Sequence, residues 1–304
     1  MSGSGSAEPG GSAEPSALDR AVVLGGGGLT GLAWLRGVLE ELPDVVNEAD
    51  QVIGTSAGAL LAARLLAGGD PAALGGHIAE LADVRVGPAA ALRLVGAQLW
   101  PSRRHALRWL GRHAVRAGTL SEAGTLSEAE FVDLVARAIG TDRWPGSLIV
   151  VAVDAVAGRP AYLTARSGVE LARAVAASCA MPGVLPAVTI DGRLYLDGGL
   201  RSPANVDLAA GCRRVLVLAP QGRSVRRVRR PGHQVARLRA NGAEVVMIAD
   251  EHPTLAAMSV AGLAGARERG RFAGRAAASA VGDLEFSAGR ARGHDAGSAT
   301  TGDR

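Results

Sequence analysis

The sequence predicts an α/β protein, namely a three-layer α/β/α sandwich with a mostly parallel central sheet. Short apolar runs of the strand type alternate with longer segments of helical periodicity along most of the chain. Helices that connect parallel strands cover both faces of their sheet, so such strands read as nearly continuous apolar runs. With 304 residues, 48% of them apolar, the chain can bury a substantial core within a single domain.

The expected strands and helices follow one another from residue 21 onward. Residues 21–24 (AVVL) end in glycines, as a buried strand does, and residues 29–42 follow as a helix. The next strand, residues 51–53, leads into a helix at residues 57–66, which ends at Gly68 and Gly69. Further strands are expected at residues 148–154, 161–164, 193–196, 214–218 and 244–249.

Three segments lie outside this alternation. Residues 1–18 and 286–304 are rich in small and polar residues, and we expect both to be disordered, on either side of a folded domain at residues 19–285. Residues 83–129 contain no strand-like run and form an expected helical insertion. It ends in a duplicated GTLSEA sequence, whose second copy should begin a helix capped by Thr125 or Ser127.

Composition argues against several other classes of protein. A formal net charge of +4 gives no case for nucleic-acid binding. Two cysteines are too few for a disulfide framework, and no Cys/His cluster has metal spacing. No apolar segment follows a charged N-terminus, and prolines interrupt the longest apolar stretch, residues 174–190. We therefore expect a cytoplasmic protein, soluble or peripheral at a membrane, without a metal or cofactor.

The strongest local signal is the sequence Gly54-Thr55-Ser56-Ala57-Gly58, between a predicted strand and a predicted helix. A G-x-S-x-G sequence in this strand–turn–helix context is the pattern of a nucleophile elbow. The turn is so tight that Gly54 and Gly58 must lack side chains. Ser56 would lie at a helix N-terminus, where amide groups and the helix dipole favour negative charge. The context predicts a nucleophilic serine.

A second signal is the glycine loop, residues 25–28, directly after the first predicted strand. Glycines can present successive amide groups to an anion, which here is either the oxyanion of a tetrahedral intermediate or a pyrophosphate. Gly26, Gly28 and Gly31 also fit the dinucleotide pattern G-x-G-x-x-G. That pattern requires an acidic residue after the second strand, whereas Asp50 precedes it, so the dinucleotide interpretation fails.

A third signal is Asp197-Gly198-Gly199, which follows the strand predicted at residues 193–196. Two glycines after a carboxylate allow this segment to approach another backbone closely. On its own, an Asp-Gly-Gly sequence more often marks a plain turn.

In this order, the three motifs resemble those of the patatin-like phospholipase family. The resemblance extends over about residues 21–219 and includes residues 25–42 (GGGGLTGLAWLRGVLEEL) and 178–188 (SCAMPGVLPAV). It implies the patatin-like fold and a serine lipid-acyl hydrolase, a phospholipase or esterase, that acts on a lipid ester through an acyl-enzyme. The implied catalytic dyad is Ser56 as nucleophile and Asp197 as general base. The implied oxyanion hole consists of the amides of Gly26, Gly27 and Gly28.

The sequence departs from the family pattern at two places. Thr30 stands where the family usually has Arg or Lys, a residue that can hold the phosphate of a phospholipid or the glycine loop itself. This departure bears on headgroup preference more than on ester cleavage. Pro203 and Asn205 follow the Asp-Gly-Gly segment, as Pro and Asn do in the family, but at altered spacing.

Two other functions fit parts of the pattern. An α/β-hydrolase with a Ser-His-Asp triad also uses G-x-S-x-G, and His233 and His252 follow Asp197 as its histidine would. A catalytically silent binding protein could use the same fold. Reaction of Ser56 with a fluorophosphonate distinguishes an enzyme from the silent protein.

The insertion suggests a site of peripheral membrane association. From Leu92 to Val115, apolar residues, among them Trp100 and Trp109, are interleaved with arginines. A basic amphipathic helix with tryptophan suits a membrane interface, where apolar burial and attraction to anionic lipid add together. The alternative is that the tryptophans pack on the sheet and the arginines face water.

Overall fold

The computed structural model describes residues 18–74, 76, 105, 108–109, 126–222, 224, 227–252 and 262–284. The terminal segments expected to be disordered, residues 1–18 and 286–304, lie outside the described residues apart from Leu18. Most of the helical insertion at residues 83–129, and of the membrane segment at residues 92–115, also lies outside them.

Within these ranges, one mixed sheet of eight strands forms the centre of the molecule. The strands are β1 (Arg20–Leu24), β2 (Gln51–Thr55), β3 (Leu148–Asp154), β4 (Arg159–Leu163), β5 (Val188–Ile190), β6 (Arg193–Asp197), β7 (Arg214–Ala219) and β8 (Glu244–Ala249). Their order is β5-β6-β3-β2-β1-β7-β8, with β4 also paired to β3. Four neighbouring pairs are parallel, namely β3–β2, β2–β1, β1–β7 and β7–β8. Strands β4 and β6 run antiparallel to β3.

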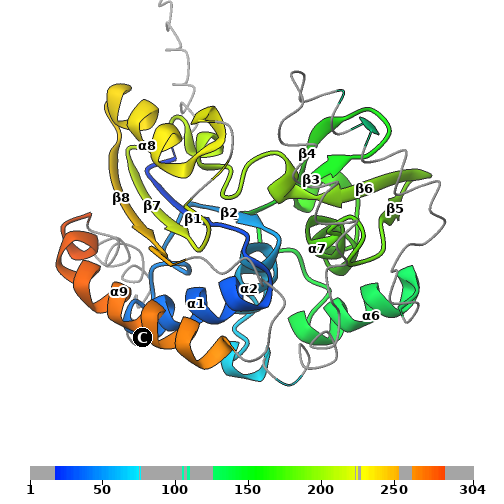
Figure 1. The fold of residues 1–304 in the computed structure, drawn as a ribbon, viewed down its shortest axis with the longest axis horizontal. Helices are drawn as coiled ribbons and strands as arrows, with labels where there is room; N and C mark the ends of the chain where they lie inside the picture. Colours follow the sequence, from blue (N-terminus) through cyan, green and yellow to red (C-terminus); the bar gives the residue numbers. More distant parts are fainter. Residues whose placement is uncertain are drawn as a thin grey trace, which may run out of the picture.

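Helices cover both faces of the sheet (Figure 1). They are α1 (Gly28–Glu41), α2 (Ala57–Leu66), α6 (Glu128–Ile139), α7 (Leu171–Cys179), α8 (Pro231–Ala240) and α9 (Leu263–Asp283). In β1, Val22 and Leu24 point into the core shared with α1, α2, α6, α7 and α9. Ala21 and Val23 point into the second core, which lies against α8. These three layers confirm the predicted fold class.

Glycines allow α1 and α9 to pack unusually closely. A Cβ at Gly37 of α1 would collide with the backbone carbonyl oxygen of Arg267 in α9, and one at Gly270 would collide with that of Trp34 in α1. Arg271 of α9 adds an ion pair to Glu41 at 3.1 Å. Helix α9 thereby fixes α1, the helix that begins in the glycine loop.

Helix α6 begins in the second copy of the duplicated GTLSEA sequence, as predicted. Ser127 is its N-cap: the Glu130 amide donates to the Ser127 hydroxyl at 3.2 Å, and the Ser127 amide donates to the Glu130 carboxylate at 2.7 Å. This reciprocal pair is a capping box. The first copy, residues 118–123, lies outside the described residues.

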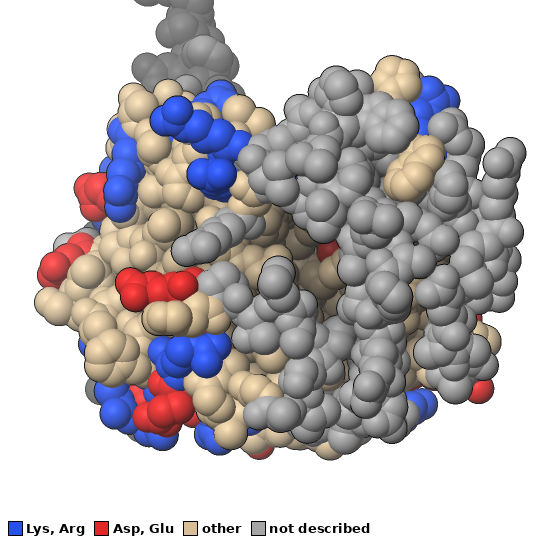
Figure 2. Space-filling view, viewed as in Figure 1, with Lys and Arg blue, Asp and Glu red and all other residues tan. Residues whose placement is uncertain are grey.

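Basic side chains gather on the surface over α8 (Figure 2, blue, upper left). In α8 and the turn before it, the exposed arginines are Arg227, Arg230, Arg237 and Arg239. None of the helices in the described part of the chain is long and apolar enough to span a bilayer.

Candidate active site

The segments that carry the three sequence motifs meet at the carboxyl edge of the parallel strands. The glycine loop follows β1, and Ser56 follows β2, which is the neighbour of β1 in the sheet. On β3, Val151 pairs with Thr55 and Ala152 pairs with Asp197. Since β3 lies between β2 and β6, this register brings Ser56 and Asp197 to the same level on either side of β3.

Ser56 occupies a strained turn between β2 and α2. Its backbone has φ 52° and ψ −123°, a conformation that residues with a side chain rarely adopt. A Cβ at Gly54 would lie 2.6 Å from the Cα of Ala59, and one at Gly58 would collide with the carbonyl of Leu24. Gly54 is therefore required by the turn itself, as inferred from the sequence, whereas Gly58 is required by the close approach of β1.

The Ser56 hydroxyl and the Asp197 carboxylate form a direct hydrogen bond. Ser56 Oγ donates to Asp197 Oδ2 at 2.7 Å, and the Gly199 amide donates to Asp197 Oδ1 at 2.6 Å. Asp197 is only 1% exposed. Burial raises the pKa of its carboxyl from 3.8 to about 6, although the hydrogen bonds from Ser56 and Gly199 oppose this rise. Asp197 is therefore ionised at neutral pH, with a pKa close to the operating range of a general base.

Ser178 connects the turn at Ser56 to β3. The Ser56 amide donates to Ser178 Oγ at 2.8 Å, and Ser178 Oγ donates to the carbonyl of Val151 at 2.6 Å. Gly198 lies over the same carbonyl, where a Cβ would collide with the oxygen. The turn at Ser56 and the segment at Gly198, which lie on either side of β3, are thus both held close to the Val151 carbonyl. The sequence analysis included Ser178 only as part of residues 178–188 and gave it no role, because a serine near a helix end has no distinguishing local pattern.

The glycine loop lies directly against Ser56. A Cβ at Gly26 would be 3.2 Å from the Cβ of Ser56. The Gly26 amide donates to the carbonyl of Pro203 at 2.8 Å, so this amide holds the loop and is not available to an oxyanion. Among the described residues, the amides of Gly27 and Gly28 have no hydrogen-bond acceptor. Gly28, with φ 59°, begins α1, so both amides belong to a helix N-terminus.

The two candidate triad histidines do not lie between serine and aspartate. Ser56 donates directly to Asp197, which leaves no place for an imidazole between them. His233 is in the first turn of α8, and its Nδ1 is buried without a partner in the described part of the structure. The backbone amide of His252 donates to Asp250, beyond the end of β8.

The family model of the patatin-like phospholipases matches residues 22–210, which is more than half of the chain. The chain belongs to this family. Uncharacterised NTE family proteins of Mycobacterium tuberculosis and Mycobacterium bovis are 30% identical to it over 205 residues, which cover 66% of this chain and 48% of each relative. The chain thus spans about half the length of these curated relatives.

Two solved structures resemble this chain at a distance. VipD from Legionella pneumophila has a TM-score of 0.41 and 14% identity, and the alignment covers 87% of this chain and 67% of VipD. The type III effector ExoU has a TM-score of 0.36 and 16% identity, with coverage of 89% and 53%. Likenesses this weak have no bearing on the function of the chain.

Two further features concern the surroundings of the glycine loop. Thr30, at the place where the family usually has Arg or Lys, is 6% exposed and faces Gly262, the residue before α9. It therefore puts no positive charge beside the glycine loop. The family match ends before β7, yet β7 pairs with β1 and its Leu218 carbonyl accepts the Gly25 amide at 2.9 Å. Residues beyond the match thus support the glycine loop.

Proposed function

We propose that this chain is a serine lipid-acyl hydrolase that cleaves a lipid ester through a dyad of Ser56 and Asp197. The observation that carries the proposal is the 2.7 Å hydrogen bond from Ser56 Oγ to Asp197 Oδ2. It lies in a strained, glycine-flanked turn after a buried strand, which is the arrangement of a nucleophile elbow. Membership of the patatin-like phospholipase family supports a lipid ester as the substrate.

In the first half of the reaction, Ser56 Oγ attacks the carbonyl carbon of the ester while Asp197 accepts the hydroxyl proton. The carbonyl oxygen becomes an oxyanion in the tetrahedral intermediate. Collapse of this intermediate breaks the bond to the leaving alcohol, which takes the proton from Asp197. The acyl group remains esterified to Ser56.

In the second half, water attacks the acyl-enzyme and Asp197 accepts its proton. The second tetrahedral intermediate collapses, the carboxylic acid leaves, and the proton returns from Asp197 to Ser56 Oγ. The same carboxyl thus acts as base and then as acid in each half. A pKa of about 6 for Asp197 suits both roles better than the ordinary value of 3.8.

The oxyanion hole in this proposal consists of the amides of Gly27 and Gly28. Both lie at the N-terminus of α1, where the helix dipole favours a negative charge. The sequence interpretation included Gly26, but its amide is engaged by Pro203. Gly26 instead contributes by lacking a side chain next to Ser56.

Fluorophosphonate labelling combined with an ester hydrolysis assay tests the proposal. Wild type should be labelled and should hydrolyse a soluble short-chain ester and lipid vesicles. Ser56→Ala and Asp197→Ala should each lose on the order of a thousandfold or more in turnover. His233→Ala and His252→Ala are the matched controls and should stay active.

Two outcomes would overturn it. An unlabelled, inactive wild type would indicate a catalytically silent binding protein. A loss in either histidine variant that equals the loss in Ser56→Ala, with folding intact, would replace the dyad by a triad.

A further inference from the structure

The proposed dyad joins two segments that are not neighbours in the sheet. Ser56 follows β2 and Asp197 ends β6, and β3 lies between these strands. Adjacent strands are about 4.8 Å apart, so the two backbones are separated by roughly 10 Å across β3. The 2.7 Å contact between their side chains therefore depends on groups that hold both segments in place.

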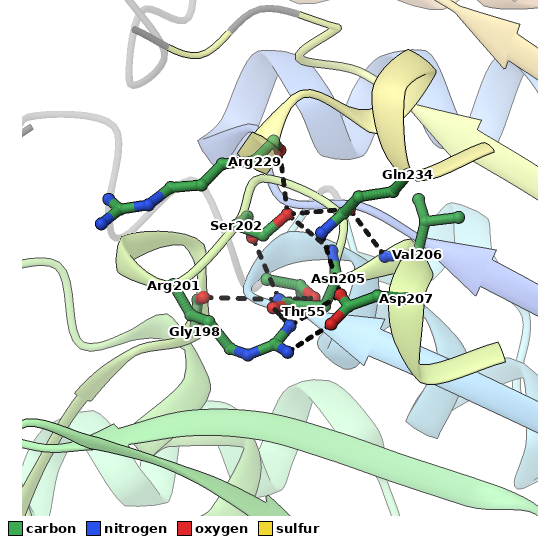
Figure 3. A network of polar contacts seen from close by, with 9 residues as sticks. All are labelled: Thr55, Gly198, Arg201, Ser202, Asn205, Val206, Asp207, Arg229 and Gln234. Carbon is green, nitrogen blue, oxygen red and sulfur yellow. Dashed lines mark hydrogen bonds and ion pairs between the residues drawn. The ribbon is translucent and has the colours of Figure 1, made fainter. Parts of the chain in front are cut away.

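Asn205 contacts both segments. Its Nδ2 donates to Thr55 Oγ1 at 2.9 Å and lies 3.4 Å from the carbonyl oxygen of Gly198. Thr55 immediately precedes Ser56, and Gly198 immediately follows Asp197. Figure 3 shows the Asn205 side chain between these two residues. A single amide group thus bridges the residue next to the nucleophile and the residue next to the base.

Asn205 is itself held rigidly. It is fully buried and adopts the left-handed conformation, with φ 55° and ψ 37°. Its Oδ1 accepts from Arg201 Nη1 at 2.7 Å, and its Nδ2 also donates to the carbonyl of Ser202 at 3.0 Å. The guanidinium of Arg201 forms an ion pair with Asp207, which accepts from Gln234 of α8 at 2.9 Å. This polar network (Figure 3) leaves the Asn205 amide one orientation.

We propose that Asn205 is a positioning residue, which sets the distance between the Ser56 hydroxyl and the Asp197 carboxylate by bridging Thr55 and Gly198. The inference rests on the proposed hydrolase function. Its two N–H groups face three acceptors, Thr55 Oγ1 and the carbonyls of Ser202 and Gly198, so one N–H is shared between two of them. Its Oδ1 accepts from Arg201. The position therefore requires a side chain with two N–H donors and one acceptor. Aspartate lacks the donors and leucine lacks all three groups.

Loss of this bridge should alter the pH profile as well as the rate. If the Ser56 hydroxyl moves away, the Asp197 carboxylate loses a hydrogen bond that favours its charged form, so its pKa rises. Among the described residues, the other groups facing Asp197 are the Gly199 amide and the Cys179 thiol of α7. Burial raises the pKa of Cys179 far above its usual range, so this thiol stays neutral at working pH.

The test compares Asn205→Gly, Thr55→Val and the double variant. Glycine suits the left-handed conformation at position 205, and valine retains the shape and strand preference of threonine. Thr189→Val is the matched control, because Thr189 Oγ1 donates to Glu128 at 2.9 Å on α6, away from the dyad. It removes one side-chain hydrogen bond by the same substitution.

We expect Asn205→Gly to lower kcat on the order of 10²-fold, the effect of a misplacement of about 1 Å, with little change in KM. Thr55→Val should lose less, and the double variant should lose no more than Asn205→Gly, since both changes remove the same contact. The acid limb of kcat/KM should move to higher pH in these variants and stay in place in Thr189→Val. Urea unfolding measures the accompanying change in stability separately.

The outcomes separate this inference from the proposed function. An active, labelled wild type whose Asn205→Gly and Thr55→Val variants match Thr189→Val in kcat and pH profile would overturn the positioning role alone. An unlabelled and inactive wild type would overturn the proposed function and this inference with it.

Discussion

Replacing Asp197 by asparagine should abolish activity and yet make the protein more stable. The carboxyl is 1% exposed, and burial raises its pKa from 3.8 to about 6. At neutral pH the folded protein must therefore keep a charge that water would solvate better. The difference between the two pKa values corresponds to about 3 kcal/mol of unfolding free energy, at about 1.4 kcal/mol per pKa unit.

The sign of the pH dependence follows from proton binding. Because the folded state binds the Asp197 proton more tightly than the unfolded state, stability falls as the pH rises from 3.8 to about 6. Above that range the buried charge lowers the unfolding free energy by the full amount, and below it this destabilisation disappears. Asp197→Asn should therefore gain up to about 3 kcal/mol at about pH 8 and nothing at about pH 3.5.

Asparagine also fits the site geometrically. Its carbonyl oxygen can accept from the Gly199 amide, and its amide group can donate to Ser56 Oγ, because a hydroxyl accepts as well as donates. The substitution thus removes the charge and leaves both contacts satisfied.

The assay is urea unfolding of wild type and Asp197→Asn at both pH values, followed by tryptophan fluorescence. Asp133→Asn, on the exposed side of α6, removes a charge of the same kind from a solvated position and serves as the control. Equal stability of wild type and Asp197→Asn at the higher pH, or the same gain at both pH values, would refute the reasoning that burial of this charge opposes folding.

The remaining predictions concern catalysis, packing and membrane binding. The acid limb of kcat/KM should have its midpoint near the Asp197 pKa of about 6, and a rate independent of pH through this range would contradict the assignment of the base. Gly28→Ala should lower kcat on the order of 10²-fold because an oxyanion donor is displaced, whereas near-normal turnover would make the loop purely structural. Ser178→Ala should cost about 2–3 kcal/mol in urea unfolding, since it leaves a buried amide and a buried carbonyl unpaired; a cost within error of zero would show that neither needs the hydroxyl. Wild type should sediment with anionic vesicles, less at high salt, and a Trp109→Ala/Arg108→Glu variant should bind less while it retains short-chain esterase activity. Equal vesicle binding by the two proteins would assign this segment to the core.

The strands of the sheet could largely be predicted from apolar runs, and their boundaries agree with the structure to within two residues. The sequence analysis missed β5, because its three residues are too few for a pattern to be recognised. The signal that could have revealed it is Asp191-Gly192, whose residues both have positive φ and connect β5 to β6 in a two-residue turn. Nor did the apolar runs show that β4 and β6 are antiparallel to β3, since direction depends on the connections.

The residues of the candidate site were easier to predict than the contacts among them. Ser56 and Asp197 lie in short glycine motifs that can be recognised in the sequence. The groups that hold these two residues in place belong to no such motif. The Ser56–Ser178 bond joins positions 122 residues apart, and the Asn205–Thr55 bond joins positions 150 residues apart. Asn205 was noted only for its altered spacing after the Asp-Gly-Gly segment.

The sequence by itself determined the fold class and the tightness of the turn at Ser56, because both depend on neighbouring residues: the period of apolar side chains, and the absence of a Cβ at Gly54, which would lie against Ala59. Only the tertiary structure decided which loop amide is engaged, how far Ser56 lies from Asp197, and how burial raises the pKa of that carboxyl. These properties depend on distances and solvent exclusion between segments that meet only after β2, β3 and β6 have paired in register.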